Sequence, residues 1–175
     1  GHFVPDLVLG ALHHFLPDRI PAEGASALWN IHISVWPENR DEGTKKRTEV
    51  LMFNRGGAGA RPTKDGLSAT AFPSGVRNTP VEINEAIAPV IVWRKEYRTD
   101  SGGPGTWRGG TGQVMEITNA EGAPFAISAM FDRVIHPPRG RSGGMNGQTG
   151  KVYLGSGKTL RQKGQQPIPS GDHLW

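Results

Sequence analysis

The sequence has 175 residues, enough for one ordinary domain, and no segment approaches the roughly 20 continuous apolar residues that span a membrane. Its 20 Lys and Arg residues against 16 Asp and Glu give a formal net charge of +4, and the two signs are mixed along the chain, which argues against a nucleic-acid-binding protein. The absence of cysteine excludes disulfides, thiolate catalysis and Cys-ligated metal sites, and it fits a reducing, cytoplasmic compartment.

Glycine and proline are unusually frequent, at 25 and 14 residues, but they follow no fixed period. This composition favours short strands joined by many turns over a helical bundle. The chain opens at Gly1 with neither methionine nor a targeting segment. We therefore expect that upstream residues have been removed or that the sequence is a piece of a longer polypeptide.

The first predicted element is a helix over residues 4–15. Its apolar residues recur at helical spacing: Val4, Leu7, Val8, Ala11, Leu12 and Phe15. Pro5 suits the first turn of a helix, and Pro17 ends it. The chain should therefore begin with a helix that has one apolar face.

Two strands are predicted next. Residues 28–36 alternate between apolar and polar side chains, as in a half-buried strand. The apolar face is formed by Trp29, Ile31, Ile33 and Val35. Residues 48–53 form the second strand, and the charged segment 37–47 between them is predicted to be a solvated loop.

The second half of the chain also reads as short strands. A strand is predicted over residues 90–97, after a helical turn at 83–88. Residues 113–118 and 125–131 are predicted to pair across the turn between them. After a short stretch at 152–154 we expect a polar loop and a last short strand. With no internal repeat, the elements predict one β-rich α+β unit with glycine-rich loops and an N-terminal helix.

The sequence matches neither of two common site patterns, the phosphate-binding loop and the histidine metal site. Residues 155–159, Gly-Ser-Gly-Lys-Thr, look like the end of a phosphate-binding loop, but the required glycine five positions before Gly157 is Val152. No apolar helix pattern follows, so we expect a tight hairpin turn with a basic side chain. None of the six histidines has the spacing of a metal-binding pair, so a self-contained metal site is not expected.

The two glycine-dense segments, residues 55–66 and 98–110, are predicted to be loops because helices and strands tolerate few glycines. Their candidate ligand-contacting residues are Arg61, Asp65, Arg98, Asp100, Ser101 and Arg108. Glycine lets a backbone approach a ligand closely, and arginine binds carboxylate or phosphate. The alternative is that these are sharp corners whose Arg–Asp pairs lock the turns internally, and composition alone favours it.

These two loops lead to a specific expectation about geometry. We expect Arg61 and Arg108 to face a shared cleft. Each arginine would be held by an acid of its own loop, Asp65 or Asp100 respectively. This expectation is based on the repeated combination of Gly, Arg and Asp in two segments far apart in the sequence.

Five blocks of sequence follow one another in a recognisable order. They are Pro5-Asp-Leu-Val-Leu-Gly-Ala-Leu12, residues 55–68, Asn78-Thr-Pro-Val-Glu82, residues 98–110, and Phe131-Asp-Arg133 followed by Gly143-Gly144. Together they closely resemble the C-terminal part of the hydantoinase B/oxoprolinase family. That family includes the B subunit of ATP-dependent N-methylhydantoinases and the matching half of 5-oxoprolinase. The resemblance covers essentially the whole chain and implies that residues 1–175 are a single C-terminal portion of a larger B-type subunit.

The resemblance also implies a function. The family opens a cyclic amide such as a hydantoin, oxoproline or lactam with ATP, or carboxylates a ketone in another branch. The resemblance implies that ATP is bound by a partner A-type subunit with an actin-like kinase fold. It also implies that a divalent metal is bound by Asp and His residues in the N-terminal part of the B subunit. No cofactor is therefore expected within residues 1–175. The expected partners are the A-type subunit and the missing N-terminal part, in an oligomer without nucleic acid or membrane.

Two further expectations follow from the resemblance. Family members often carry paired asparagines on the strand equivalent to residues 28–33, where this chain has Trp29-Asn30, so Asn30 is a candidate substrate contact with altered specificity. Arginines and glycine-loop amides suit an anionic phosphorylated intermediate. The non-catalytic alternative is that residues 1–175 serve as a scaffold for subunit assembly. By itself the chain should be inactive and should expose apolar surface through which it self-associates.

Overall fold

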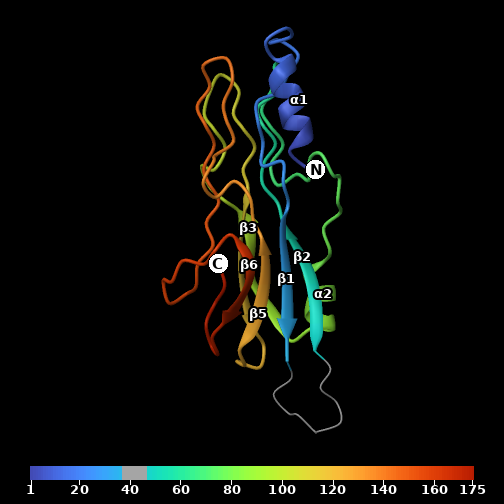
Figure 1. The fold of residues 1–175 in the computed structure, drawn as a ribbon, viewed down its shortest axis with the longest axis vertical. Helices are drawn as coiled ribbons and strands as arrows, with labels where there is room; N and C mark the ends of the chain where they lie inside the picture. Colours follow the sequence, from blue (N-terminus) through green and yellow to red (C-terminus); the bar gives the residue numbers. More distant parts are fainter. Residues whose placement is uncertain (37–46) are drawn as a thin grey trace.

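The computed structural model describes residues 1–36 and 47–175, a strand-rich chain with two short helices and two antiparallel sheets (Figure 1). In chain order the elements are α1 (Val4–Leu12), β1 (Trp29–Val35), β2 (Thr48–Asn54), α2 (Val81–Ile87), β3 (Val90–Tyr97), β4 (Gln113–Asn119), β5 (Phe125–Met130) and β6 (Lys163–Ile168). The predicted β-rich fold class with an N-terminal helix is confirmed. Most of the predicted charged loop, residues 37–46, lies outside the described residues. Neither described helix has the length and apolar character to cross a bilayer.

The four-stranded sheet has the order β2-β1-β5-β6, and β3 pairs with β4 in a separate two-stranded sheet. The register places Ile33 of β1 beside Val50 of β2 and Ile127 of β5. The predicted pairing of residues 113–118 with 125–131 is therefore wrong, because β4 and β5 belong to different sheets. Most side chains of β5 are buried, which fits a central strand flanked on both edges better than one arm of an isolated hairpin.

The hydrophobic core is shared by both sheets. The alternation predicted for residues 28–36 is confirmed, since Ile31, Ile33 and Val35 are all buried in it. Met115 and Ile117 of β4 pack into the same core, together with residues that follow the strands: Phe131, Val152, Leu154, Leu160 and Leu174. The core therefore lies at the strand end of the molecule, and the long loops extend beyond it (Figure 1).

The polar loop predicted after Leu154 contains a strand that the sequence pattern did not indicate. Residues Lys163–Ile168 form β6 at the edge of the four-stranded sheet, where only Gln166 and Ile168 are buried. An edge strand can carry polar residues and proline, so its sequence reads like a loop. The strand predicted at the terminus is reduced to bridges at Leu174, which pairs with Ile117 and Leu154.

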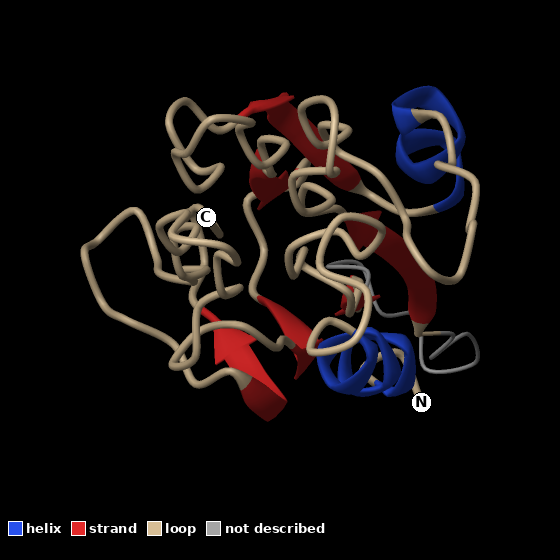
Figure 2. Cartoon of the chain, turned by 90° about the horizontal axis from the view of Figure 1, so that it is seen from above, coloured by secondary structure: helices blue, strands red, loops and turns tan. Residues whose placement is uncertain are grey.

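The two glycine-dense segments are loops, as predicted, and they lie side by side beyond the sheets (Figure 1). Seen from above, this end of the molecule consists mainly of loops (Figure 2). Backbone hydrogen bonds join them directly. The Gly66 N–H donates to the Arg108 carbonyl at 2.8 Å, and the Gly110 N–H donates to the Ala58 carbonyl at 2.9 Å. Ala58 in turn donates to the Leu67 carbonyl at 2.9 Å. The loops therefore form one hydrogen-bonded block, although 31 or more residues separate them in the sequence.

Close approach of backbones explains why this block contains so much glycine. A β-carbon added at Gly57 would overlap the carbonyl oxygen of Gly110, and one added at Gly102 would overlap that of Gly109. No side chain larger than hydrogen fits at such contacts. At these two glycines the α-carbon lies directly against neighbouring backbone, although both residues also line the cavity described below. At these positions the structural interpretation of the glycine-dense loops holds.

Candidate functional site

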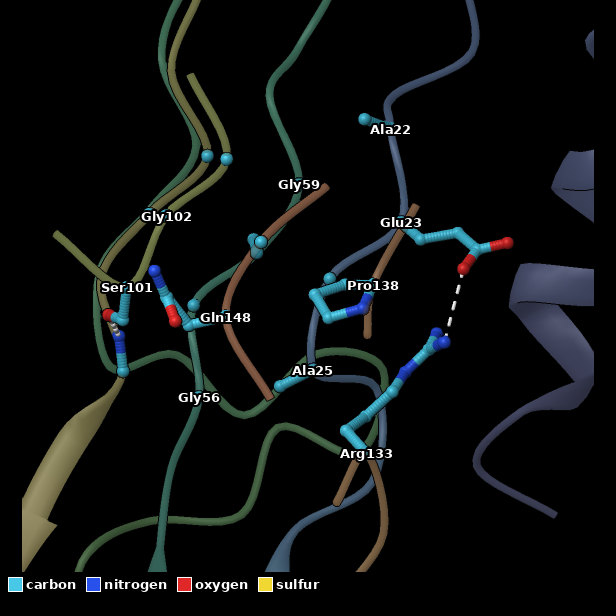
Figure 3. A pocket seen from close by; sticks show the side chains of 18 of the residues that line it. Ala22, Glu23, Ala25, Gly56, Gly59, Ser101, Gly102, Arg133, Pro138 and Gln148 are labelled. Carbon is cyan, nitrogen blue, oxygen red and sulfur yellow. Dashed lines mark hydrogen bonds and ion pairs between the residues drawn. The ribbon is translucent and has the colours of Figure 1, made fainter. Parts of the chain in front are cut away.

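A cavity of about 670 Å³ lies among the glycine-dense loops and the adjoining end of the sheets (Figure 3). Its walls come from segments far apart in the sequence, including residues 22–27, 54–62, 98–115 and 138–151. Most charged residues along it are arginines. Asp18 and Glu23 are the only acids among its described lining residues. A concave, mainly basic site of this kind suits an anionic ligand better than a cationic one.

The cavity brings together three of the predicted site residues. Arg61, Arg98 and Ser101 line it. Outside the lining lie Asn30, Asp65, Asp100 and Arg108. The two loops are adjacent, as a shared cleft requires, but only one arginine of the expected pair Arg61 and Arg108 belongs to the cavity wall.

The contacts of these two arginines follow the expectation only in part. Arg108 Nη2 donates to Asp100 Oδ1 at 2.5 Å, so this arginine is held by the acid of its own loop, as predicted. Arg61 instead donates through Nε and Nη2 to the main-chain oxygen of Asp65, at 2.8 and 2.6 Å. The predicted contact with the Asp65 carboxylate is wrong, because the tight turn between Arg61 and Lys64 presents the following carbonyl to the guanidinium.

The Asp65 carboxylate has a different role. It accepts a hydrogen bond from the main-chain N–H of Arg108 at 2.7 Å and thereby links the two loops. Ser101 acts similarly within its loop, since its Oγ donates to the Arg98 carbonyl and accepts from the Gly112 N–H, both at 2.8 Å. Both side chains are thus engaged in holding loop geometry.

The remaining two predicted site residues are also tied to neighbouring structure. Arg98 Nη1 donates to the carbonyl of Thr149 at 2.7 Å, which fastens its loop to the segment after Pro138. Asn30 lies on β1 beside Met130 of β5 and is not among the lining residues of the cavity. Its Oδ1 is buried and accepts no hydrogen bond from the residues that the structure describes.

An ion-pair cluster that sequence reasoning missed forms part of the cavity wall, since Glu23, Arg133 and Arg139 line the cavity. Arg133 Nη2 is 2.6 Å from Asp6 Oδ2, and its Nη1 is 3.1 Å from Glu23 Oε2 (Figure 3 shows the Glu23 contact). Arg139 Nε donates to Glu23 Oε1 at 2.7 Å, and the Ser26 hydroxyl donates to the Asp6 carboxylate. The side chains of Glu23 and Arg133 are only 4% and 14% exposed. The cluster is therefore a substantially buried charge network.

The surroundings of Glu23 keep it ionised. Burial alone would raise its pKa, but hydrogen bonds from Arg139 and the positive charges of Arg133 and Arg139 outweigh burial and lower the pKa. The same hydrogen bond and charge raise the pKa of Arg139. Glu23 and Arg139 are thus stabilised in their charged forms.

Two residues of the cluster have a strained backbone. Ser26 and Arg133 both have a φ of 58°, in the left-handed region that non-glycine residues seldom adopt. Both side chains contact Asp6.

The sequence offered one signal for this cluster. Asp6 and Arg133 each lie in one of the five sequence blocks that carry the family resemblance. Nothing in the local sequence, however, pairs residues so far apart.

The structure also bears on the cofactors implied by the family resemblance. Within residues 1–36 and 47–175, no group of three or more His, Asp or Glu side chains lies close enough together to hold a metal ion. The segment 155–159 is a tight hairpin turn, as predicted, in which the Gly157 N–H donates to the Leu154 carbonyl at 2.8 Å. No helix follows this turn, so it lacks the helix N-terminus with which phosphate-binding loops hold nucleotides. This segment therefore does not form a phosphate-binding loop.

Comparison with known proteins identifies relatives along the whole chain. The model of the Hydantoinase B/oxoprolinase family matches residues 1–175. 5-oxoprolinase 1 of Arabidopsis thaliana is 41% identical over 100 residues, which cover 57% of this chain and 8% of that protein. The B subunit of a putative D-/L-hydantoinase of Pseudomonas sp. (strain NS671) is 27% identical over 160 residues, which cover 91% of this chain and 26% of that protein. The chain thus spans about a quarter of the hydantoinase polypeptide and less than a tenth of the oxoprolinase.

A solved structure shares the fold. The ATP-dependent caprolactamase from Pseudomonas jessenii matches with a TM-score of 0.69 over 94% of this chain and 30% of that one. The sequence identity is 21%, so this similarity concerns the fold alone.

Proposed function

Since this chain belongs to the hydantoinase B/oxoprolinase family, we propose that it is the C-terminal part of the B-type subunit of an ATP-dependent cyclic-amide hydrolase. The observation that carries this proposal is the match of the family model to all 175 residues. Support comes from relatives named as a 5-oxoprolinase, as the B subunit of a hydantoinase and as the beta subunit of a caprolactamase. The substrate class is a hydantoin, an oxoproline or a lactam ring.

The proposed reaction needs a site that tolerates anions. A ring amide is a poor electrophile, and transfer of a phosphoryl group from ATP to its oxygen creates a good leaving group together with negative charge. ATP would be used by an A-type subunit, and a divalent metal would be held by another part of the B-type subunit. Residues 1–175 would contribute positive charge for binding the anionic intermediate, since Arg61 and Arg98 line the basic cavity.

A second role for this part of the subunit is supported by a specific observation. The N–H groups of Gly66, Gly109 and Gly110 are already bonded to neighbouring carbonyls, and Asp65 and Ser101 hold loop geometry. Groups engaged in this way are not available to a ligand without rearrangement. The loops would then be a scaffold for contacts between subunits, with the chemistry carried out elsewhere.

The test uses the intact complex of A-type and B-type subunits. ATP-dependent phosphate release is measured against a panel of hydantoin, 5-oxoproline, lactams, and ketones with bicarbonate. The proposal expects release with at least one cyclic amide, together with the ring-opened product. Release only with a ketone and bicarbonate would instead indicate the carboxylase branch.

Two arginine variants then separate the site role from the scaffold role. Arg98→Ala removes a cavity cation, and Arg77→Ala removes an exposed arginine that is not among the lining residues. A site role predicts that only Arg98→Ala lowers turnover while the complex still assembles. A scaffold role predicts that any loss of turnover by Arg98→Ala follows a loss of assembly.

A further inference from the structure

Helix α1 is oriented with its apolar side chains toward solvent and its acid toward the protein. Asp6 is the only buried residue of the helix. The exposed apolar residues of the helix and the turn after it are Val4, Leu7, Val8, Leu12, Phe15 and Leu16. Leu7 is 70% exposed and Phe15 is 82% exposed. This is the reverse of the usual arrangement, in which the apolar stripe of a surface helix faces the core.

Directional polar contacts hold the helix in this orientation. Asp6 is bound by Arg133 and Ser26, as described above. Arg141 Nη1 donates to the Leu9 carbonyl at 3.1 Å, from the same side of the helix. The Arg133 guanidinium also lies 5.0 Å from the centre of the Phe3 ring, just before the helix. The apolar face is therefore turned outward by specific bonds at the opposite face.

The backbone strain at the cluster strengthens this interpretation. Strained non-glycine residues persist only where the surrounding structure holds them. Here Ser26 and Arg133 both adopt a left-handed conformation, and both contact the single acid of α1. Two independent segments thus adopt unfavourable conformations at the point where they fix the helix.

We propose that the outward face of α1, formed by Val4, Leu7, Val8 and Leu12, is the surface on which an apolar region of the remaining part of the same B-type subunit docks. The helix contains no charged residue apart from Asp6, so the docking surface has no charge to match and requires an apolar partner. This inference rests on the proposed function, which makes residues 1–175 part of a longer subunit.

The size of the face favours a partner within the same polypeptide. A helix of nine residues is about 14 Å long, and its one face is far smaller than the roughly 800 Å² per partner of a stable interface between separate proteins. A contact within one chain does not lose the translational freedom that two molecules lose on association. The relatives supply the necessary chain, because residues 1–175 match only 26% of the hydantoinase relative and 24% of the caprolactamase relative.

Thiol labelling of the polypeptide in which residues 1–175 naturally occur tests this proposal. Residues 1–175 contain no cysteine, so a new thiol is followed by mass spectrometry of its own peptide. Leu7→Cys places the thiol on the docking face, and Glu121→Cys places a control thiol on the exposed turn between β4 and β5. Each labelling rate with N-ethylmaleimide is divided by its rate in urea. We expect residue 7 to react at least about tenfold more slowly than residue 121, at every protein concentration.

The other outcomes overturn the proposal. Equal normalised rates would show that the face is open. Protection that disappears on dilution would show that the occupant is a second molecule. If Leu7→Cys does not fold, Val8→Cys on the same face gives the same readout. Labelling requires no turnover, so protection without activity on any cyclic amide would count against the proposed function and leave the docking surface intact.

Discussion

Arg133 Nη2 and Asp6 Oδ2 lie 2.6 Å apart although 127 positions separate the two residues in the sequence. The contact joins the first turn of α1 to the segment that follows β5. Because Arg133 also binds Glu23, it connects three segments that have no strand pairing in common. The orientation of α1 depends on this one guanidinium more than on apolar packing.

We expect Asp6→Asn to lower the free energy of unfolding by about 2 kcal/mol, because it removes one of the two carboxylates that pair with the largely buried Arg133. Urea denaturation at neutral pH measures the change. The matched control is Asp132→Asn, which breaks the more exposed pair with Lys163 and should cost at most about 1 kcal/mol. Equal losses in the two variants would contradict a special role for the Asp6 pair.

Stability should fall in acid partly because of Glu23. Its pKa is lowered in the folded protein, so the unfolded chain binds a proton more readily as the pH falls. The contribution is therefore complete above the ordinary glutamate pKa of about 4.3 and is lost as the pH falls through the lower, folded value. The measurement is urea denaturation at a series of pH values from neutral to acid. Glu23→Gln should have a lower free energy of unfolding at neutral pH than the wild type, and this free energy should fall less steeply as the pH is lowered. Glu121→Gln, on an exposed turn, should show the same pH dependence as the wild type.

The close packing of the glycine loops can be tested by adding one methyl group. Gly57→Ala places a β-carbon on the Gly110 carbonyl oxygen, and we expect it to cost about 2 kcal/mol or more. Gly112→Ala is the control in the adjoining loop, since the nearest atom would lie 3.6 Å from its β-carbon. Its effect should stay within about 0.5 kcal/mol. Thermal unfolding of both variants gives the comparison, and similar melting temperatures would argue against backbone contact at Gly57.

Arg61 and Arg108 should differ in their effect on turnover of the intact complex. If an anionic transition state is stabilised in the cavity, Arg61→Ala lowers kcat by roughly tenfold or more, because Arg61 lines it. Arg108→Ala should lower kcat less, because its guanidinium binds Asp100 outside the cavity lining. Steady-state kinetics with separate kcat and KM values decides this, and a larger kcat effect at Arg108 would exclude the assignment.

The 175-residue chain alone should release no phosphate from ATP in the presence of magnesium and hydantoin. Its described residues offer neither a nucleotide-binding loop nor a metal-ligand cluster. Light scattering of the same sample should show self-association only at high protein concentration, because the uncovered face around Leu7 is apolar but too small for a stable interface between separate molecules. Clear turnover by the chain alone would refute this division of labour.

Local sequence patterns predicted those elements whose side chains alternate within one strand or helix. Ile31, Ile33 and Val35 marked β1 because each faces the same core. The patterns failed where partners are distant or where a strand lies at an edge. Lys163–Ile168 reads as a loop because only one face of an edge strand is buried, and the pairing of β5 depends on β1 and β6 rather than on its nearest neighbour in sequence.

The candidate site shows the same division. The glycine content of the two segments correctly predicted loops, and their arginine and aspartate residues correctly predicted the Arg108–Asp100 contact. It could not indicate that Arg61 binds a carbonyl, because that depends on the turn at Lys64. The buried network of Asp6 and Glu23 was invisible for a different reason: its members are spread over most of the chain, and each looks like an ordinary surface charge.

The backbone bonds between the two glycine-dense loops have a mechanical consequence. Gly66 to Arg108 and Gly110 to Ala58 are direct main-chain links, without flexible side chains between them. The two loops should therefore move together as one unit. A contact made with the exposed loop near Arg108 should then also shift the cavity wall at Arg61, which the contacting protein need not touch.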